Sequence, residues 1–169
     1  IQVRILFLGD VVGKSGCSSL KKNLKNIINQ KNIDFVIVNG ENAAEEGVGI
    51  SEKISNELFS YGVDVITTGN HVWDLKETAQ YITQENKLLR PFNLPSATPG
   101  EGFRIYKLKN GLKIGVLNLM GNIFMKKCEN VFESSVLFLK KNVLKKDFDF
   151  LVVDFHGEIT SGKNGYRPF

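Results

Sequence analysis

The sequence has little of what marks secreted, membrane or disulfide-rich proteins. It holds two cysteines among 169 residues, and no apolar run approaches the ~20 residues that a membrane-spanning helix needs. Cys17 and Cys128 cannot build a disulfide framework, so we expect a reducing, cytoplasmic compartment and no membrane partner. No leader of charged, apolar and small residues opens the printed sequence, and its first apolar run ends at Gly9-Asp10, which is typical of a strand.

The composition is that of a globular protein. Apolar residues make up 42% and charged residues 24%, which excludes a disordered or collagen-like chain. The length suits one domain over residues 1–169. Basic residues outnumber acidic ones by 22 to 18, which is a mild sign of anionic partners such as phosphates. The lysine pairs are scattered and predict a solvated face, so nucleic acid stays open as a partner without support; the pairs are Lys126-Lys127, Lys140-Lys141 and Lys145-Lys146.

Strands and helices alternate along the first half of the chain. Short apolar runs predict strands at 3–8, 35–38 and 63–67. Apolar residues at helical spacing predict helices at 18–30, 51–60 and 73–83. Ser18 or Ser19 would cap the first of these helices and Ser51 the second.

The second half adds a hairpin, a helix and a last strand. Asn110-Gly111 between apolar runs at 103–108 and 113–119 predicts a β-hairpin. An amphipathic helix is expected at 133–146, with Val136, Leu139 and Val143 on its apolar stripe. A strand at 148–155 follows. This order predicts an α/β layered sandwich with a mixed sheet.

Polar residues gather at the carboxyl ends of four predicted strands. In open α/β sheets ligands bind at these ends, and glycines at 9, 40 and 69 let the backbone approach a ligand closely. Both histidines of the chain are in the set. The candidate site residues are Asp10, Glu41, Asn42, Asn70, His71 and His156.

Carboxylate, amide and imidazole groups together suit Mn, Fe or Zn ions, and the lack of thiolates argues against a structural zinc site. A carboxylate can bridge two ions, and two metals ~3.5–4 Å apart can generate a hydroxide nucleophile and clamp a phosphoryl group. A histidine beside the metals can protonate the leaving oxygen. The set therefore predicts metal-assisted phosphoester hydrolysis.

Each residue also has a plainer interpretation. An acid after a strand commonly caps a helix, and a single histidine is more often structural than catalytic. Trp73 is more easily explained by core packing than by stacking on a base. The segment Gly9–Ser15 resembles a phosphate-binding P-loop, but only three residues separate Gly9 from Gly13 where the P-loop needs four, so we reject a nucleoside triphosphatase.

Six short motifs follow one another in a recognisable order: GDVVGK at 9–14, NGENAA at 39–44, TTGNHVWD at 67–74, TPG at 98–100, NLMG at 118–121 and VDFH at 153–156. This order resembles the calcineurin-like metallophosphoesterases and, among them, the bacterial cyclic-nucleotide phosphodiesterase (YmdB-like) family. The resemblance covers nearly the whole chain. It implies a layered α/β/β/α sandwich with mixed sheets.

The resemblance also implies a role for each candidate residue. Asp10 would bind the first metal, Glu41 would bridge both, and Asn42 would lie in the same metal shell. Asn70 and His156 would bind the second metal. His71 would donate a proton to the leaving oxygen. The implied substrates are cyclic nucleotides or related phosphodiesters, and the implied cofactors are two ions of iron or manganese.

One departure from the family qualifies these expectations. The family continues after VDFH to a Gly-Thr-His-x-His loop that gives one histidine to each metal, whereas this chain has two histidines in total. We therefore expect a C-terminally truncated member that lacks the last strands of the sandwich. The alternative function is a catalytically impaired remnant that acts as a binding module, either as a homo-oligomer or in association with a missing fragment.

Overall fold

The computed structural model describes residues 2–122 and 128–157. Its first sheet is wholly parallel and contains β1 (Ile5–Leu8), β2 (Phe35–Asn39), β3 (Val65–Thr67) and β4 (Leu88–Leu89) in that order. Its second sheet is mixed: β5 (Phe103–Lys107) pairs antiparallel with β6 (Lys113–Met120), which pairs parallel with β7 (Phe150–His156). An α/β fold is thus confirmed, but only the second sheet is mixed.

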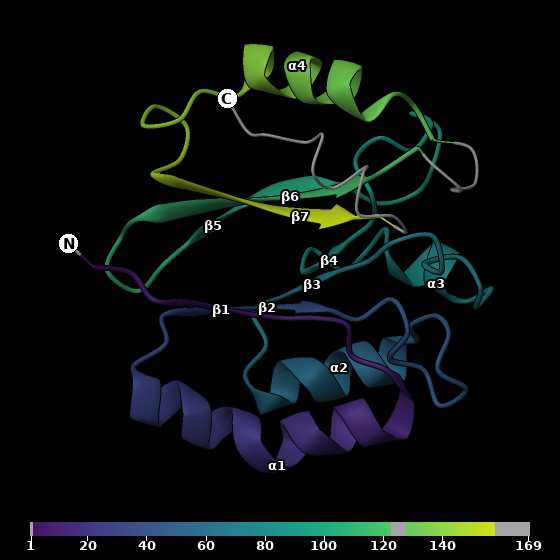
Figure 1. Cartoon of the computed structure of the whole chain (residues 1–169), viewed down its shortest axis with the longest axis vertical. Helices are drawn as coiled ribbons and strands as arrows, with labels where there is room; N and C mark the ends of the chain where they lie inside the picture. The colour runs from purple at the N-terminus through teal and green to yellow at the C-terminus, as the bar shows by residue number, and fades with distance from the viewer. Residues whose placement is uncertain (1, 123–127, 158–169) are drawn as a thin grey trace.

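The two sheets lie face to face between helices (Figure 1). The helices α1 (Gly13–Lys31) and α2 (Glu52–Tyr61) cover the outer face of the first sheet, and α4 (Val131–Lys141) covers the second. A short helix, α3 (Thr78–Tyr81), lies beyond β3. No helix in the described ranges is both long and apolar enough to cross a membrane.

Side-chain alternation explains the layers. On β2, Val36 and Val38 pack toward the helices while Phe35 and Ile37 pack toward the second sheet. All five residues of β2 are buried, as is typical of a parallel strand covered on both faces. Three apolar layers result: one under α1 and α2, one between the sheets and one under α4.

Two local predictions are confirmed. The Ser51 side chain caps α2 by accepting a hydrogen bond from the Ile54 backbone N–H at 3.2 Å. The hairpin turns at Asn110-Gly111, where Gly111 has a φ of +88° that favours glycine. The described lysines of the three pairs, at 140, 141, 145 and 146, are exposed as expected, whereas Lys126 and Lys127 lie outside the described residues.

The predicted start of the first helix is wrong. The helix begins at Gly13 rather than near residue 18, and its N-cap is Val12, which makes no side-chain capping bond. The backbone supplies the anchor instead, because the Gly13 N–H donates to the Asn42 carbonyl at 2.9 Å. Gly13 has a φ of +55°, so glycine suits this sharp entry to the helix.

The helix predicted over 73–83 shrinks to the four residues of α3. The segment before it forms turns, and the Asp74 N–H donates to the His71 carbonyl at 3.1 Å. A hydrogen-bonded turn from His71 to Asp74 and the turns after it therefore take the place of the first half of the expected helix.

The apolar stripe predicted for α4 is also wrong. Val136, Leu139 and Val143 are exposed, while Val131, Ser134, Ser135 and Phe138 form the buried face. The Phe138 ring fixes this rotation, because it packs edge-on against Phe103 with ring centres 4.6 Å apart. The helix is also shorter than predicted and ends at Lys141.

Candidate metal and active site

The site lies where the carboxyl ends of strands from both sheets meet. Asp10 follows β1, the pair Glu41-Asn42 follows β2, and the pair Asn70-His71 follows β3. His156 is the last residue of β7 and so belongs to the second sheet. The predicted convergence therefore takes place between two facing sheets, not along the edge of one sheet.

Buried amide side chains tie these sheets together close to the site. Asn39 at the end of β2 donates from Nδ2 to Asp154 Oδ2 on β7 at 3.0 Å, and Asn118 on β6 donates to the Thr68 carbonyl at 2.8 Å. Both bonds are buried, and buried hydrogen bonds fix geometry more strictly than apolar contacts do. They hold β7 against the end of β2, and β6 against the residue that follows β3.

Three of the predicted residues contact one another directly. The two ring nitrogens of His156 face two oxygens: Nδ1 lies 3.0 Å from Glu41 Oε1, and Nε2 lies 2.7 Å from Asn70 Oδ1. Glu41 is only 1% exposed. The contact joins the ends of β2, β3 and β7, which are far apart in the sequence.

Gly69 makes this approach possible. A Cβ atom at this position would overlap the Glu41 carboxylate and would come within 2.7 Å of the His156 ring. Any side chain at residue 69 would therefore push the two groups apart.

Asp10 and Asn42 form a second group. The Asn42 amide donates to Asp10 Oδ2 at 2.7 Å, and Asn42 also accepts the Gly13 N–H through its carbonyl. Asp10 lies close enough to Glu41 to raise the pKa of that carboxyl by charge repulsion. The two groups of predicted ligands are thus neighbours.

Negative charge is concentrated here and is poorly solvated. Burial raises the pKa of Glu41 to about 7, the charges of Asp10 and Asp154 add to the rise, and the His71 backbone N–H opposes it. Burial also raises the pKa of Asp154, against hydrogen bonds from Thr67 and Asn39. A cation beside these carboxyl groups would favour their charged forms.

His71 takes a different place from the other candidates. Its backbone N–H donates to Glu41 Oε2 at 3.3 Å, whereas its imidazole Nδ1 faces Asp74 Oδ2 at 2.6 Å. About a third of each side chain is exposed. The histidine therefore borders the ligand group with its ring held by a carboxylate, an arrangement that suits proton transfer better than metal binding.

The residues fit a metal ion as a partial ligand set. Across residues 2–122 and 128–157, no three His, Cys, Asp or Glu side chains form a group that could hold a metal by themselves. The side chains of Glu41 and His156 make a group of three possible metal ligands only when the Asn70 amide is included. The fourth and fifth candidates, Asp10 and the Asn42 amide, form a separate pair. Mixed oxygen and imidazole donors suit manganese, iron or zinc.

Three polar residues at the site were missed by the sequence analysis. Asp74 orients His71, and their His-x-x-Asp spacing was a usable signal. Asn39 and Asp154 join the two sheets by a buried hydrogen bond. In the sequence, each stands out as a polar residue within a strongly apolar strand, which indicates a buried hydrogen-bond partner.

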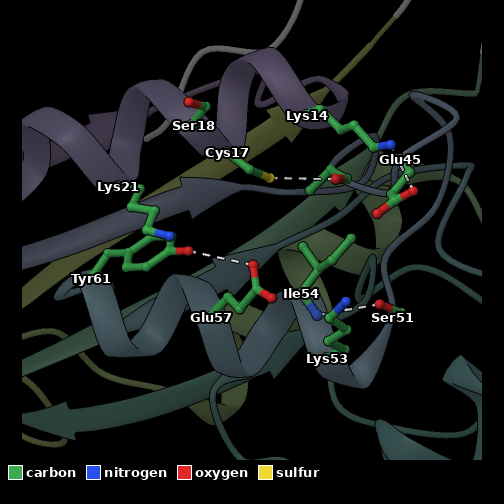
Figure 2. Close-up of a pocket in the computed structure, with 11 residues that line it drawn as sticks. Lys14, Cys17, Ser18, Lys21, Glu45, Ser51, Lys53, Ile54, Glu57 and Tyr61 are labelled. Carbon is green, nitrogen blue, oxygen red and sulfur yellow. Dashed lines mark hydrogen bonds and ion pairs between the residues drawn. The ribbon is translucent and has the colours of Figure 1, made fainter.

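A hollow apart from this cluster lies beside the loop that holds Ala43 and Glu45 (Figure 2). It measures about 470 Å³ between α1 and α2, and none of the six predicted site residues lines it. Its charges are partly paired, with Lys14 Nζ 3.0 Å from Glu45 Oε2. The Cys17 thiol donates to the Ala43 carbonyl at 3.4 Å and so supports the loop from behind.

The fold and the strand-end cluster define an α/β protein of the kind that binds ligands at the carboxyl ends of its strands. Comparison with known proteins makes the assignment specific: the profile of the YmdB-like protein family matches residues 6–167. The chain belongs to this family.

Relatives and solved structures agree with this assignment. A Bacillus subtilis (strain 168) protein named 2′,3′-cyclic-nucleotide 2′-phosphodiesterase is 39% identical over 161 residues, which cover 95% of this chain and 60% of that protein. A crystal structure of a hypothetical protein from Thermus thermophilus superposes with a TM-score of 0.86 at 34% identity, over 96% of this chain and 61% of the other. That of a Mycoplasma pneumoniae phosphatase gives 0.84 at 37% identity, over 96% and 58%. The chain thus spans about 60% of the length of the proteins it matches.

Proposed function

We propose that the chain carries the core of a metal-dependent phosphodiesterase that acts on cyclic nucleotides or related phosphodiesters. The observation that supports this most strongly is the contact of Glu41, Asn70 and His156 across two sheets, beside the pair of Asp10 and Asn42. Five polar groups from four strand ends are hard to explain as helix caps, because their side chains bond to one another rather than to helix N-termini. The family and the name of the Bacillus subtilis relative add independent support.

The family resemblance suggests the ligand roles, and the two neighbouring groups of side chains support them. Asp10 and Asn42 would hold one ion of manganese or iron, Asn70 and His156 would hold the other, and Glu41 would bridge the two. Ions bound there supply Lewis-acid chemistry, which neutralises phosphoryl charge and lowers the pKa of a water molecule. Substrate oxygens, water and groups beyond this set would complete the coordination.

His71 would donate the proton that the leaving oxygen needs. Asp74 holds its Nδ1 at 2.6 Å, which leaves Nε2 as the nitrogen that can reach a substrate. The Asp74 carboxylate also fixes the orientation of the ring before the substrate arrives. The backbone bond from His71 to Glu41 keeps this acid beside the ligands.

Hydrolysis of bis-p-nitrophenyl phosphate with Mn²⁺ or Fe²⁺ tests this proposal. Glu41→Ala should abolish metal-dependent turnover, and His71→Ala should lower it about 100-fold or more, the usual contribution of a general acid. Glu133→Gln, on the exposed first turn of α4, is the matched control and should leave turnover unchanged. Turnover that survives both site substitutions would overturn the mechanism.

Two observations favour a second function. The described residues hold no complete metal set, and the outer face of α4 exposes large apolar side chains such as Phe132 and Leu137. A binding module that works with a partner chain or a second copy would have both features. Elemental analysis separates the two: two ions per chain support the enzyme, and none supports the binding module.

A further inference from the structure

An apolar pocket of about 480 Å³ adjoins the candidate ligand cluster. Its lining comes from three separate parts of the chain: the turn after β3, the loop between β4 and β5, and the end of β6. The residues that form its walls are Asn70, Trp73, Leu94, Pro95, Thr98 and Met120. None of them is charged, so the pocket is not built for a phosphate.

The pocket shares a wall with the ligand cluster. Asn70 lines the pocket, and its Oδ1 lies 2.7 Å from Nε2 of His156. Met120 lines it as well, and this residue pairs with His156 in the parallel register of β6 and β7. A molecule with its polar end at His156 therefore has an apolar space directly beside it.

Trp73 gives this space an aromatic wall. It is the only tryptophan in the chain. It is half-buried and packs partly against the core layer under α1 and α2, yet it also lines the pocket. The sequence alone favoured core packing, whereas the structure gives this ring a second role at the pocket.

The chemistry of the walls suits a flat, mostly apolar ring with a few polar edges. Aromatic side chains bind nucleobases by stacking, which is tolerant of base identity because every base has a π-face. Asn70 and Thr98 supply the few polar groups that orient a ligand in an apolar pocket. Pockets that bind small ligands usually measure about 300–1,000 Å³. The volume of this pocket, about 480 Å³, falls within that range.

We propose that this pocket binds the nucleobase of a nucleotide whose phosphate lies at the Glu41, Asn70 and His156 cluster, with Trp73 as the stacking side chain. The inference rests on the proposed phosphodiesterase function and adds the part of the substrate that is recognised. It predicts a preference for nucleotides over phosphodiesters without a base.

The single tryptophan makes binding directly measurable. The whole 169-residue chain is kept in chelator, so that no hydrolysis occurs, and Trp73 fluorescence is followed during titration. The probes are adenosine 2′,3′-cyclic phosphate, adenosine and ribose 5-phosphate. We expect a saturable fluorescence change with the first two probes and none with the third.

Two leucine variants test whether adenosine binds in this pocket. Leu94→Glu puts a charge into the pocket and should raise the half-saturating adenosine concentration about tenfold or more, the order expected when one stacked base is lost. Leu139→Glu adds the same charge on the exposed face of α4 and should change nothing. Trp73 stays in place as the reporter in both variants, and a far-UV circular dichroism spectrum like that of the original chain shows that each variant is folded.

Two results would overturn the inference. One is no saturable change with adenosine or its cyclic phosphate up to about 10 mM, as expected if a further chain segment fills the pocket or if Trp73 only packs. The other is an equal response to ribose 5-phosphate, which would mean that the phosphate is sensed and the base is not. Neither result bears on the hydrolysis of bis-p-nitrophenyl phosphate with metal, because that substrate has no nucleobase. Failure of this inference can therefore be distinguished from failure of the proposed function.

Discussion

At the scale of single residues, the site depends on close approach and on partners outside the ligand set. Gly69 leaves room for Glu41 to reach His156, and Asp74 fixes the ring of His71. Neither residue carries the proposed chemistry itself. Their roles depend on distances across the fold, which sequence spacing alone does not give.

Gly69→Ala should weaken the site without removing any ligand. Because its Cβ would overlap the Glu41 carboxylate, we expect Mn²⁺ binding to weaken about 10- to 100-fold, as when groups that orient ligands are lost. Calorimetric titration with Mn²⁺ measures this. Gly121→Ala is the matched control, since its new Cβ would meet nothing closer than 3.5 Å. Equal Mn²⁺ affinity in the two variants would contradict the packing argument.

Asp74→Asn tests the orientation of His71. The amide carries no charge and can turn its N–H₂ group toward the ring, so we expect kcat to fall about 10- to 100-fold, with little change in KM. Glu77→Gln, an exposed acid nearby, should behave as the original chain does. A change in KM alone would argue against this role.

The buried carboxyl of Glu41 predicts an unusual pH dependence for the metal-free protein. Its pKa rises from 4.5 to about 7 on folding, so the folded state binds this proton more tightly than the unfolded state. Its contribution to stability is therefore greatest below about pH 4.5 and is lost as the pH rises through 7, by on the order of 3 kcal/mol.

Urea unfolding in chelator at pH 5 and pH 8 measures this loss. Glu41→Gln should remove most of the difference between the two pH values, while Glu133→Gln should keep it. An equal pH dependence in the Glu41→Gln variant and the original chain would show that other groups cause the effect.

At the scale of elements, α4 shows how two helical stripes can compete. The predicted stripe of Val136, Leu139 and Val143 has the right spacing and consists of apolar residues alone, yet these residues are exposed. The buried stripe includes Ser134 and Ser135, whose small size lets the helix approach the second sheet. Phe138 decides between the two, because it fills a space among Phe92 and Phe103 that helical periodicity alone cannot show.

Two neighbouring residues of α4 test this rotation. Phe138→Ala should lower the free energy of unfolding by about 3–5 kcal/mol, since the ring is 2% exposed within an aromatic cluster. Leu137→Ala, where the side chain is 56% exposed, should change it by less than about 0.5 kcal/mol. Urea denaturation measures both. The reverse order would contradict the rotation of α4 that buries Phe138.

At the scale of the whole molecule, the sequence predicted which residues gather but not how. The strand-end rule correctly brought Asp10, Glu41, Asn70 and His156 into one region, because parallel strands point their carboxyl ends the same way. It could not tell that His156 arrives from a second sheet. That depends on pairings such as Asn39 with Asp154, which are 115 residues apart.

Local structure was predictable where local chemistry decides it. The Ser51 cap and the Asn110-Gly111 turn need only their neighbours in the sequence. The start of α1 and the shortening of α3 are set by bonds to the site loops, to Asn42 and to His71 respectively. Sequence patterns failed mainly where an element contributes to the site.

The central claim is that these strand ends form one metal-binding site. Anomalous diffraction from crystals of the protein grown with Mn²⁺ tests it most directly. We expect anomalous density within coordination distance, about 2–2.6 Å, of Glu41 and His156 side-chain atoms. Density only elsewhere, or none at saturating Mn²⁺, would contradict it.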